Sequence, residues 1–194
     1  MGPVDAPSVS VIGDSLVYQA EGSDTSGAPT RKLADELVVA GYRAHVSGWI
    51  GETLDAGHQQ LWPSVAGEAD LDVLVIALGT NDINQDIPIE TSRAALQRWL
   101  AETDHVGCVA LVGVNELAYA WELDVHGPAF NAMLSEEAAA RPNAIFVRFD
   151  PIVDPDTYDG DVHFPTEDRQ AEYRSTIRGA VESCSDRIEA ADVR

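Results

Sequence analysis

Blocks of apolar residues recur along the chain at regular intervals, separated by segments of mixed polarity. Five short runs are rich in Val, Ile and Leu and have the length of buried strands. Four of them are apolar almost throughout, which is typical of central strands covered on both faces, whereas the second alternates. The predicted strands are residues 8–12, 42–46, 71–78, 109–114 and 144–149.

The segments between these runs carry apolar residues at helical spacing. Several begin near a proline or a small polar residue and end near a glycine or a proline, as helices do. The predicted helices are one capped by Thr30 and ended by Gly41, one over 54–65 that Pro63 ends or kinks, one that starts at Thr91 or Ser92, one over 128–141, and one over 165–183. Two long loops are predicted, over 19–29 and 150–161.

Strands that alternate with helices predict a parallel sheet with helices on both faces. The expected fold class is therefore α/β, a three-layer α/β/α sandwich around a five-stranded parallel sheet. No repeat, low-complexity tract or linker divides the 194 residues, so we expect a single domain over 1–194. Residues 1–7 are expected to be flexible, and residues 185–194 to be frayed.

Acidic residues far outnumber basic ones in this chain. The sequence has 33 Asp and Glu against 12 Lys and Arg, which gives a formal net charge of −21. Such a surface repels phosphate backbones and anionic lipids, so nucleic acids and membrane surfaces are not expected partners. Lys32 is the only lysine and Leu33 follows it, which excludes a P-loop.

No apolar run is long enough to span a bilayer, and the first residues lack the basic and apolar regions of a signal peptide. We therefore expect a soluble protein, cytoplasmic if the chain is complete and secreted if a leader has been removed. Cys108 and Cys184 lie far apart and form no CxxC pair, so both are expected to be reduced structural thiols.

Polar residues with catalytic chemistry follow the predicted strands, where α/β sheets bind their ligands. Ser15 stands in Gly-Asp-Ser-Leu after the first strand, and Asn81 stands in Gly-Thr-Asn-Asp after the third. A loop with two glycines, residues 47–53, follows the second strand, and His163 closes an Asp-rich block before the last helix. Taken alone, each block also fits an ordinary turn, in which Asp82 would bond to the backbone.

Together, and in this order, the four blocks resemble those of the SGNH hydrolases, also called GDSL esterases and lipases. The resemblance spans residues 13–163, most of the chain. It implies a flavodoxin-like SGNH hydrolase fold and acyl transfer by a serine, without a cofactor. The Gly-x-Ser-x-Gly elbow of the α/β-hydrolases is absent, because Val17 stands where the second glycine would be.

The resemblance implies a role for each matching residue. Ser15 would be the nucleophile, and His163 would take its proton and pass it to the leaving group. The oxyanion would be held by the backbone N–H groups of Ser15 and Gly51 and by the side-chain amide of Asn81. Gly51 fits the pattern better than Gly48, because an acidic residue and a threonine follow it.

The histidine block departs from the family pattern, which places an aspartate three residues before the histidine. That position is Gly160 here, and Asp159 and Asp161 flank it. Asp161 is the favoured third member of a triad, and a shifted loop would let either carboxylate reach the imidazole. A Ser-His dyad, or a histidine oriented by a backbone carbonyl, is the alternative.

Aromatic residues near the predicted site could bind a substrate. Trp49, beside the oxyanion glycine, is the main candidate for a substrate-binding residue. Trp62, Tyr119 and Trp121 are further candidates, whereas Trp99 has the spacing of a core residue.

No metal ion is expected. The aspartates between residues 150 and 161 do not have the spacing of an EF-hand loop, and neither HExxH nor a compact Cys/His cluster occurs. Four further histidines fall outside the matching blocks and are expected to be structural or exposed: His45, His58, His105 and His126.

The favoured function is a serine esterase that hydrolyses a carboxylic ester of a small or exposed acyl group, such as acetyl, because the short chain has no long lid insertion. Acyl transfer to an alcohol at the same site, and a non-catalytic binding domain on the same fold, are the alternatives. Negative charge at Glu52 and in residues 150–161 favours a neutral or cationic ester as the small-molecule substrate over an anionic one.

Overall fold

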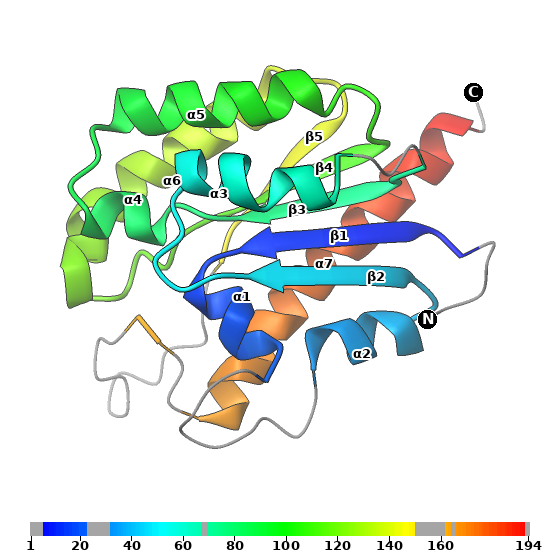
Figure 1. Ribbon diagram of the computed structural model, residues 1–194, viewed down its shortest axis with the longest axis horizontal. Coiled ribbons are helices and arrows are strands. Elements are labelled where there is room, and N and C mark those ends of the chain that lie inside the picture. Colours follow the sequence, from blue (N-terminus) through cyan, green and yellow to red (C-terminus); the bar gives the residue numbers. More distant parts are fainter. Residues whose placement is uncertain (1–5, 23–31, 67–69, 150–161, 164–165, 193–194) are drawn as a thin grey trace.

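The computed structural model is an α/β sandwich around one five-stranded sheet (Figure 1). All five strands are parallel, in the order β2-β1-β3-β4-β5. The structure describes residues 6–22, 32–66, 70–149, 162–163 and 166–192. The strands are β1 (Ser8–Gly13), β2 (Arg43–Gly48), β3 (Val73–Ala77), β4 (Cys108–Val112) and β5 (Ala144–Val147). All five predicted apolar runs therefore form strands.

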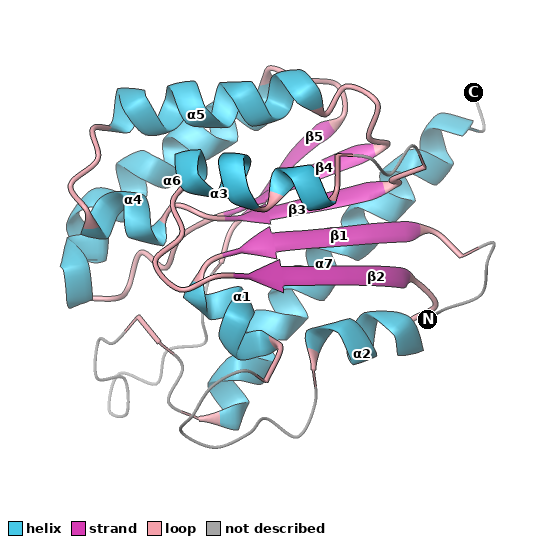
Figure 2. Ribbon diagram, in the orientation of Figure 1, coloured by secondary structure: helices cyan, strands magenta, loops and turns pink. Residues whose placement is uncertain are grey.

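Helices cover both faces of the sheet, so the predicted three-layer arrangement is confirmed (Figure 2). One face carries α3 (Leu54–Gln60), α5 (Ile89–Glu102) and α6 (Leu123–Ala139). The other face carries α1 (Ser15–Ala20), α2 (Leu33–Val39) and α7 (Glu167–Asp192). The short helices are α4 (Thr80–Asn84), η1 (Trp62–Ser64) and η2 (Ala120–Glu122). Within the described residues, no helix combines the length and the apolar character needed to cross a membrane.

Burial on both faces explains why the central strands do not alternate in sequence. Every residue of β1, β3 and β4 is buried. β2 lies at one edge, and its first residues alternate between exposed and half-buried positions. β5 lies at the other edge, and its last three residues are only half-buried. The prediction that the apolar run of β5 marks a central strand was therefore wrong.

The carboxyl ends of the strands meet at one edge of the sheet, because all the strands are parallel. Gly13, the last residue of β1, pairs in register with Gly48 of β2 and with Ala77 of β3. The segments that follow these three strands therefore start side by side. They carry three of the four sequence blocks.

Several helices differ from the prediction. α1 and α4 were not predicted, because helices of six and five residues are too short to show a helical period. α6 begins at Leu123 rather than Pro128, since Leu123 is itself fully buried, and α7 continues past its predicted end to Asp192. Gly41 ends α2 with a φ of +100°, as expected, whereas the predicted cap Thr30 lies outside the described residues.

Cys108 and Cys184 form a disulfide bond, so the prediction of two reduced thiols was wrong. Cys108 begins β4, and Cys184 lies in α7, the helix that packs along that strand. This packing brings together two residues that are 76 positions apart in the sequence, with their Cα atoms 5.4 Å apart. Both side chains are fully buried. The bond ties the last helix covalently to the sheet.

Candidate active site

Ser15 and His163 meet at the carboxyl edge of the sheet, although 148 positions separate them in the sequence. Ser15 is the first residue of α1, directly after β1, and its Oγ lies 3.0 Å from Nε2 of His163. Val162 is buried in the core and fixes the backbone beside His163. A hydroxyl and an imidazole at hydrogen-bond distance are the pair that general-base activation of a serine requires.

A tight turn presents the Ser15 hydroxyl at the end of β1. Asp14 caps α1, since its Oδ1 accepts a hydrogen bond from the backbone N–H of Leu16 at 2.9 Å. A Cβ atom on Gly13 would lie 2.2 Å from Cγ2 of Val17, so only glycine allows the chain to pass so directly from strand to helix. Gly13 and Asp14 therefore together hold Ser15 at the start of α1.

Asn81 lies in α4, directly after β3, and is almost fully buried. Its Nδ2 donates a hydrogen bond to the backbone oxygen of Glu52 at 3.1 Å, which holds the amide against the loop after β2. A carboxamide nitrogen carries two N–H groups. One of them fixes the orientation of Asn81, and the other is available to a second acceptor.

Gly48, the last residue of β2, and Gly51, in the loop that follows, are glycines for different reasons. A Cβ atom on Gly48 would lie 2.4 Å from the backbone nitrogen of Tyr18, so Gly48 allows β2 to pack closely on α1. Gly51 has open space around it but a φ of +80°, the left-handed conformation that favours glycine. Its carbonyl accepts a hydrogen bond from Nε2 of Gln85 at 3.2 Å. Gly51 is thus attached to the end of the helix that carries Asn81.

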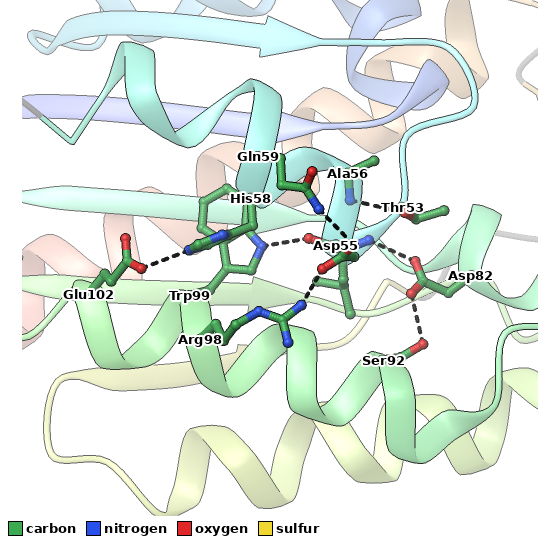
Figure 3. Close-up of polar contacts among 11 residues, drawn as sticks. Thr53, Asp55, Ala56, His58, Gln59, Asp82, Ser92, Arg98, Trp99 and Glu102 are labelled. Atoms are coloured by element: carbon green, nitrogen blue, oxygen red, sulfur yellow. Dashed lines mark hydrogen bonds and ion pairs between the residues drawn. The ribbon is translucent and has the colours of Figure 1, made fainter.

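Asp82 joins three elements around the site. Its Oδ2 accepts a hydrogen bond from the backbone N–H of Leu54 at 3.0 Å, and its Oδ1 accepts one from Oγ of Ser92 at 2.7 Å. Figure 3 shows the Asp82 carboxylate between α5 and the start of α3. The prediction that Asp82 bonds to the backbone is confirmed, but that backbone belongs to α3 rather than to its own turn.

Three carboxyl groups are buried at this edge of the sheet, those of Asp14, Glu52 and Asp82. Burial raises the pKa of Asp14 to about 7, although hydrogen bonds from the Leu16 amide and the Thr80 side chain act in the opposite direction. Burial also raises the pKa of Glu52 and that of Asp82. These carboxyl groups hold their protons at a higher pH than they would in water, which limits the negative charge beside the nucleophile.

Two tryptophans lie near Ser15 and His163. The rings of Trp121 and His163 are in contact, with centroids 5.6 Å apart and planes at 87°. Trp49 is half-exposed, and its backbone N–H donates to the oxygen of Gly13 at 3.1 Å, which places it beside the nucleophile turn. The sequence identified Trp121 as a substrate-binding candidate but gave no sign of its contact with His163, because spacing does not show which ring a loop residue will face.

Other candidates lie elsewhere. Trp62 is buried against Trp99 in the core, so its prediction as a lining residue was wrong, whereas the prediction for Trp99 is confirmed. His58 contacts Glu102 at the far end of α5, as Figure 3 shows. Asp161, Asp159 and the rest of residues 150–161 lie outside the described residues. In the described part of the chain, no three His, Cys, Asp or Glu side chains gather as a metal site would need.

The sequence of the chain matches one family model over almost its whole length. The model is that of the GDSL-like Lipase/Acylhydrolase family, and the match covers residues 11–192. No curated protein sequence matches the chain significantly.

Solved structures share the fold at low sequence identity. The crystal structure of TesA is 24% identical, with a TM-score of 0.68, and the match covers 91% of this chain and 99% of TesA. Axe2, an acetylxylan esterase from Geobacillus stearothermophilus, is 16% identical, with a TM-score of 0.71 and coverage of 93% and 95%. The catalytic domain of peptidoglycan O-acetyltransferase A from Streptococcus pneumoniae is 19% identical, with a TM-score of 0.66 and coverage of 93% and 96%. These similarities show an SGNH hydrolase fold.

Proposed function

The chain belongs to the GDSL-like lipase/acylhydrolase family, and on that premise we propose that it is a serine esterase that works through an acyl-enzyme formed on Ser15. The observation that carries the proposal is the 3.0 Å contact between Oγ of Ser15 and Nε2 of His163. A serine hydroxyl is a weak nucleophile until a base accepts its proton. The contact supplies that base in position.

Acylation and deacylation use the same two residues. His163 accepts the proton of Ser15 through Nε2 while Oγ attacks the ester carbonyl, and it then donates that proton to the departing alcohol. Water attacks the acyl-enzyme in the second half, and His163 takes its proton in the same way. His163 returns this proton to Oγ of Ser15 as the bond between Oγ and the acyl carbon breaks, which regenerates Ser15 and releases the carboxylic acid.

The oxyanion of each tetrahedral intermediate is held by the backbone N–H groups of Ser15 and Gly51 and by Nδ2 of Asn81. Two observations support this set. Glu52 holds the Asn81 amide in place, and Gln85 attaches Gly51 to the same helix. Loss of one such donor typically lowers the rate by about 100-fold or more.

Asp161 is the residue we propose to orient the His163 imidazole, with Asp159 as the alternative. The family places an acidic residue close before the histidine, and here these two flank Gly160. Asp161→Ala and Asp159→Ala, compared at equal stability, assign the role to the residue whose loss lowers kcat by a larger factor. Two equal and small losses would point to a Ser-His dyad.

The substrate we propose is a carboxylic ester of a small or exposed acyl group, neutral or cationic in its remaining part. Similar folds serve an acetylxylan esterase and a peptidoglycan O-acetyltransferase, and both descriptions name acetyl chemistry. p-Nitrophenyl esters of two, four and twelve carbons test the acyl size, and a preference for the twelve-carbon ester would contradict it. Adding an alcohol acceptor distinguishes transfer from hydrolysis by the products formed.

We also propose that the protein folds in an oxidising compartment or outside the cell. The buried Cys108–Cys184 bond supports this, because structural disulfides form and persist mainly in such environments. Mass spectrometry of the protein purified from its source without reductant measures the state of both cysteines. Two free thiols would contradict the proposal.

A fluorophosphonate probe tests the catalytic role of Ser15 directly. Wild-type protein is expected to be labelled on Ser15, and Ser15→Ala is expected to lose both labelling and esterase activity. Ser183→Ala, which removes an exposed hydroxyl on α7, is the matched control and is expected to keep both. Folded wild-type protein that takes up no label would instead favour a non-catalytic binding domain.

A further inference from the structure

The Trp121 side chain contacts the imidazole of His163, the proposed catalytic base. The two ring centroids are 5.6 Å apart and the planes are nearly perpendicular, at 87°. Trp121 belongs to η2, in the connection from β4 to α6, and therefore reaches His163 from a part of the chain distant in sequence. A perpendicular ring pair at this distance is a favourable aromatic contact, and a cation that lies over the face of a tryptophan within about 6 Å is stabilised by the ring quadrupole.

The backbone at Trp121 adopts a conformation that side chains disfavour. Trp121 has φ and ψ of 59° and 24°, and Glu122 has 55° and 31°. Both residues are thus in the left-handed region, which is normally left to glycine, asparagine or aspartate. Two successive residues of other types there persist only where the surrounding structure holds them, and such places are often functional.

The strained pair is anchored on both sides. Ala118 before it and Leu123 after it are fully buried, and the backbone N–H of Asp124 donates to the oxygen of Ala118 at 3.0 Å. Further upstream, the Asn131 amide bonds to both backbone groups of Val114, at 2.8 and 3.0 Å. The loop is therefore a fixed support that turns Trp121 towards His163.

We propose that Trp121 is a positioning residue of the reaction, which holds the His163 imidazole at Ser15 and stabilises the imidazolium that forms when His163 accepts the Ser15 proton. The proposal rests on the proposed function. This role explains the strained backbone, since an unstrained turn would place the indole away from His163. The contact acts in both halves of the reaction, because His163 becomes protonated in each.

Packing of an apolar loop residue against the core is the competing explanation, and two substitutions separate the two. Trp121→Leu keeps an apolar side chain but removes the aromatic ring, whereas Trp121→Phe keeps a ring. A packing role predicts that activity follows the free energy of unfolding in both variants. A positioning role predicts that activity is kept in the variant with an aromatic ring and lost in the variant without one, whatever their stabilities.

The experiment measures kcat, KM and urea unfolding for both variants with p-nitrophenyl acetate. Trp121→Leu is expected to lower kcat about 10-fold, which lies within the range of an aromatic–cation contact, with KM changed less than about twofold. Trp121→Phe is expected to recover most of that loss. Val125→Ala, which trims an exposed side chain at the start of α6, is the control for surface substitutions.

An unchanged kcat in Trp121→Leu, or equal losses in the leucine and phenylalanine variants, would overturn the role of Trp121. Wild-type protein is tested in parallel with the fluorophosphonate probe. Labelling of Ser15 together with an unchanged kcat in Trp121→Leu overturns this inference alone. Absence of labelling overturns the proposed function, and the inference with it.

Discussion

Asp14 stands next to Ser15, the proposed nucleophile, and has almost no contact with solvent, at 1% exposure. Its carboxyl group caps α1 through the Leu16 amide, but that bond only partly offsets the burial, which raises the pKa to about 7. The residue therefore has two effects. Asp14 fixes the turn that presents Ser15, and its raised pKa favours the neutral carboxyl group beside Ser15.

Asp14→Asn tests the second effect through the pH dependence of stability. The folded-state pKa of Asp14, about 7, lies above the unfolded value, so its contribution to stability is fully present below about pH 4 and is lost as the pH rises through 7. Between pH 5 and 8 the free energy of unfolding of the wild type should therefore fall by about 2 to 3 kcal/mol more than that of the variant. Asparagine keeps the oxygen that accepts from Leu16.

Urea unfolding of both proteins at pH 5 and pH 8 makes the comparison. Glu52 and Asp82 titrate in both proteins, and the charge coupling between Asp14 and Asp82 is counted as part of the Asp14 effect. Parallel changes of stability with pH in the two proteins would show that Asp14 does not titrate in this range.

At the scale of elements, the site depends on how closely helices follow strands. Gly79 is the N-cap residue directly before α4, and its φ of +131° is a conformation that other residues rarely adopt. A Cβ atom there would lie 2.3 Å from Cε1 of Phe130, a buried residue of α6. The angle and the contact together place Asn81 beside the loop after β2, so the sharp passage from β3 to α4 is part of the site.

Gly79→Ala is therefore expected to destabilise the protein by more than about 2 kcal/mol, through backbone strain and overpacking, and to lower esterase activity by displacing Asn81. Gly179→Ala is the matched control, since a Cβ atom on Gly179 meets nothing within 4 Å in α7. That variant should gain up to about 1 kcal/mol from helix propensity and keep its activity. Thermal unfolding and initial rates of both variants measure the contrast, and similar losses in the two would refute it.

At the scale of the whole molecule, the disulfide joins the sheet to the helix that closes the fold. Cys108 and Cys184 enclose a segment of the chain that includes β4, α6 and β5. A cross-link between residues this far apart lowers the conformational entropy of the unfolded chain. The entropy of the folded chain hardly changes, because packing already fixes the same residues.

Replacing both cysteines by alanine should lower the free energy of unfolding by about 4.5 kcal/mol, the chain-entropy value for a loop of 76 positions. Reductant should destabilise the wild type to a similar extent and leave the double variant unchanged. Urea unfolding with and without reductant measures both effects. If the free energy of unfolding of the wild type is the same with and without reductant, the bond is absent.

The net charge of −21 is also a property of the whole molecule. It should repel an anionic substrate and favour a neutral one of the same shape, such as methyl 4-acetoxybenzoate over 4-acetoxybenzoate. The ratio of their kcat/KM values should fall towards unity with added salt, because the Debye length shortens from about 10 Å at 0.1 M to about 3 Å at 1 M. A ratio that does not change with salt would show that the charge has no part in substrate choice.

The sequence predicted the layers and the pairing of Ser15 with His163 because the residues concerned leave a local signal. Buried parallel strands read as continuous apolar runs, and Ser15, Asn81 and His163 each stand in a short block at a strand end or before a helix. Short elements left no such signal. α1 and α4 are less than two turns long, and β5 reads like a central strand although it lies at an edge.

The sequence by itself therefore determined the α/β class, the alternation of strands and helices along the chain, and which residues are candidates for the chemistry. Only the tertiary structure decided which of them meet. The Cys108–Cys184 bond, the reach of Asp82 to Leu54 and the contact of Trp121 with His163 all join residues remote in sequence. Periodicity reports how a segment meets solvent, whereas a contact between distant segments depends on the position of every element between them.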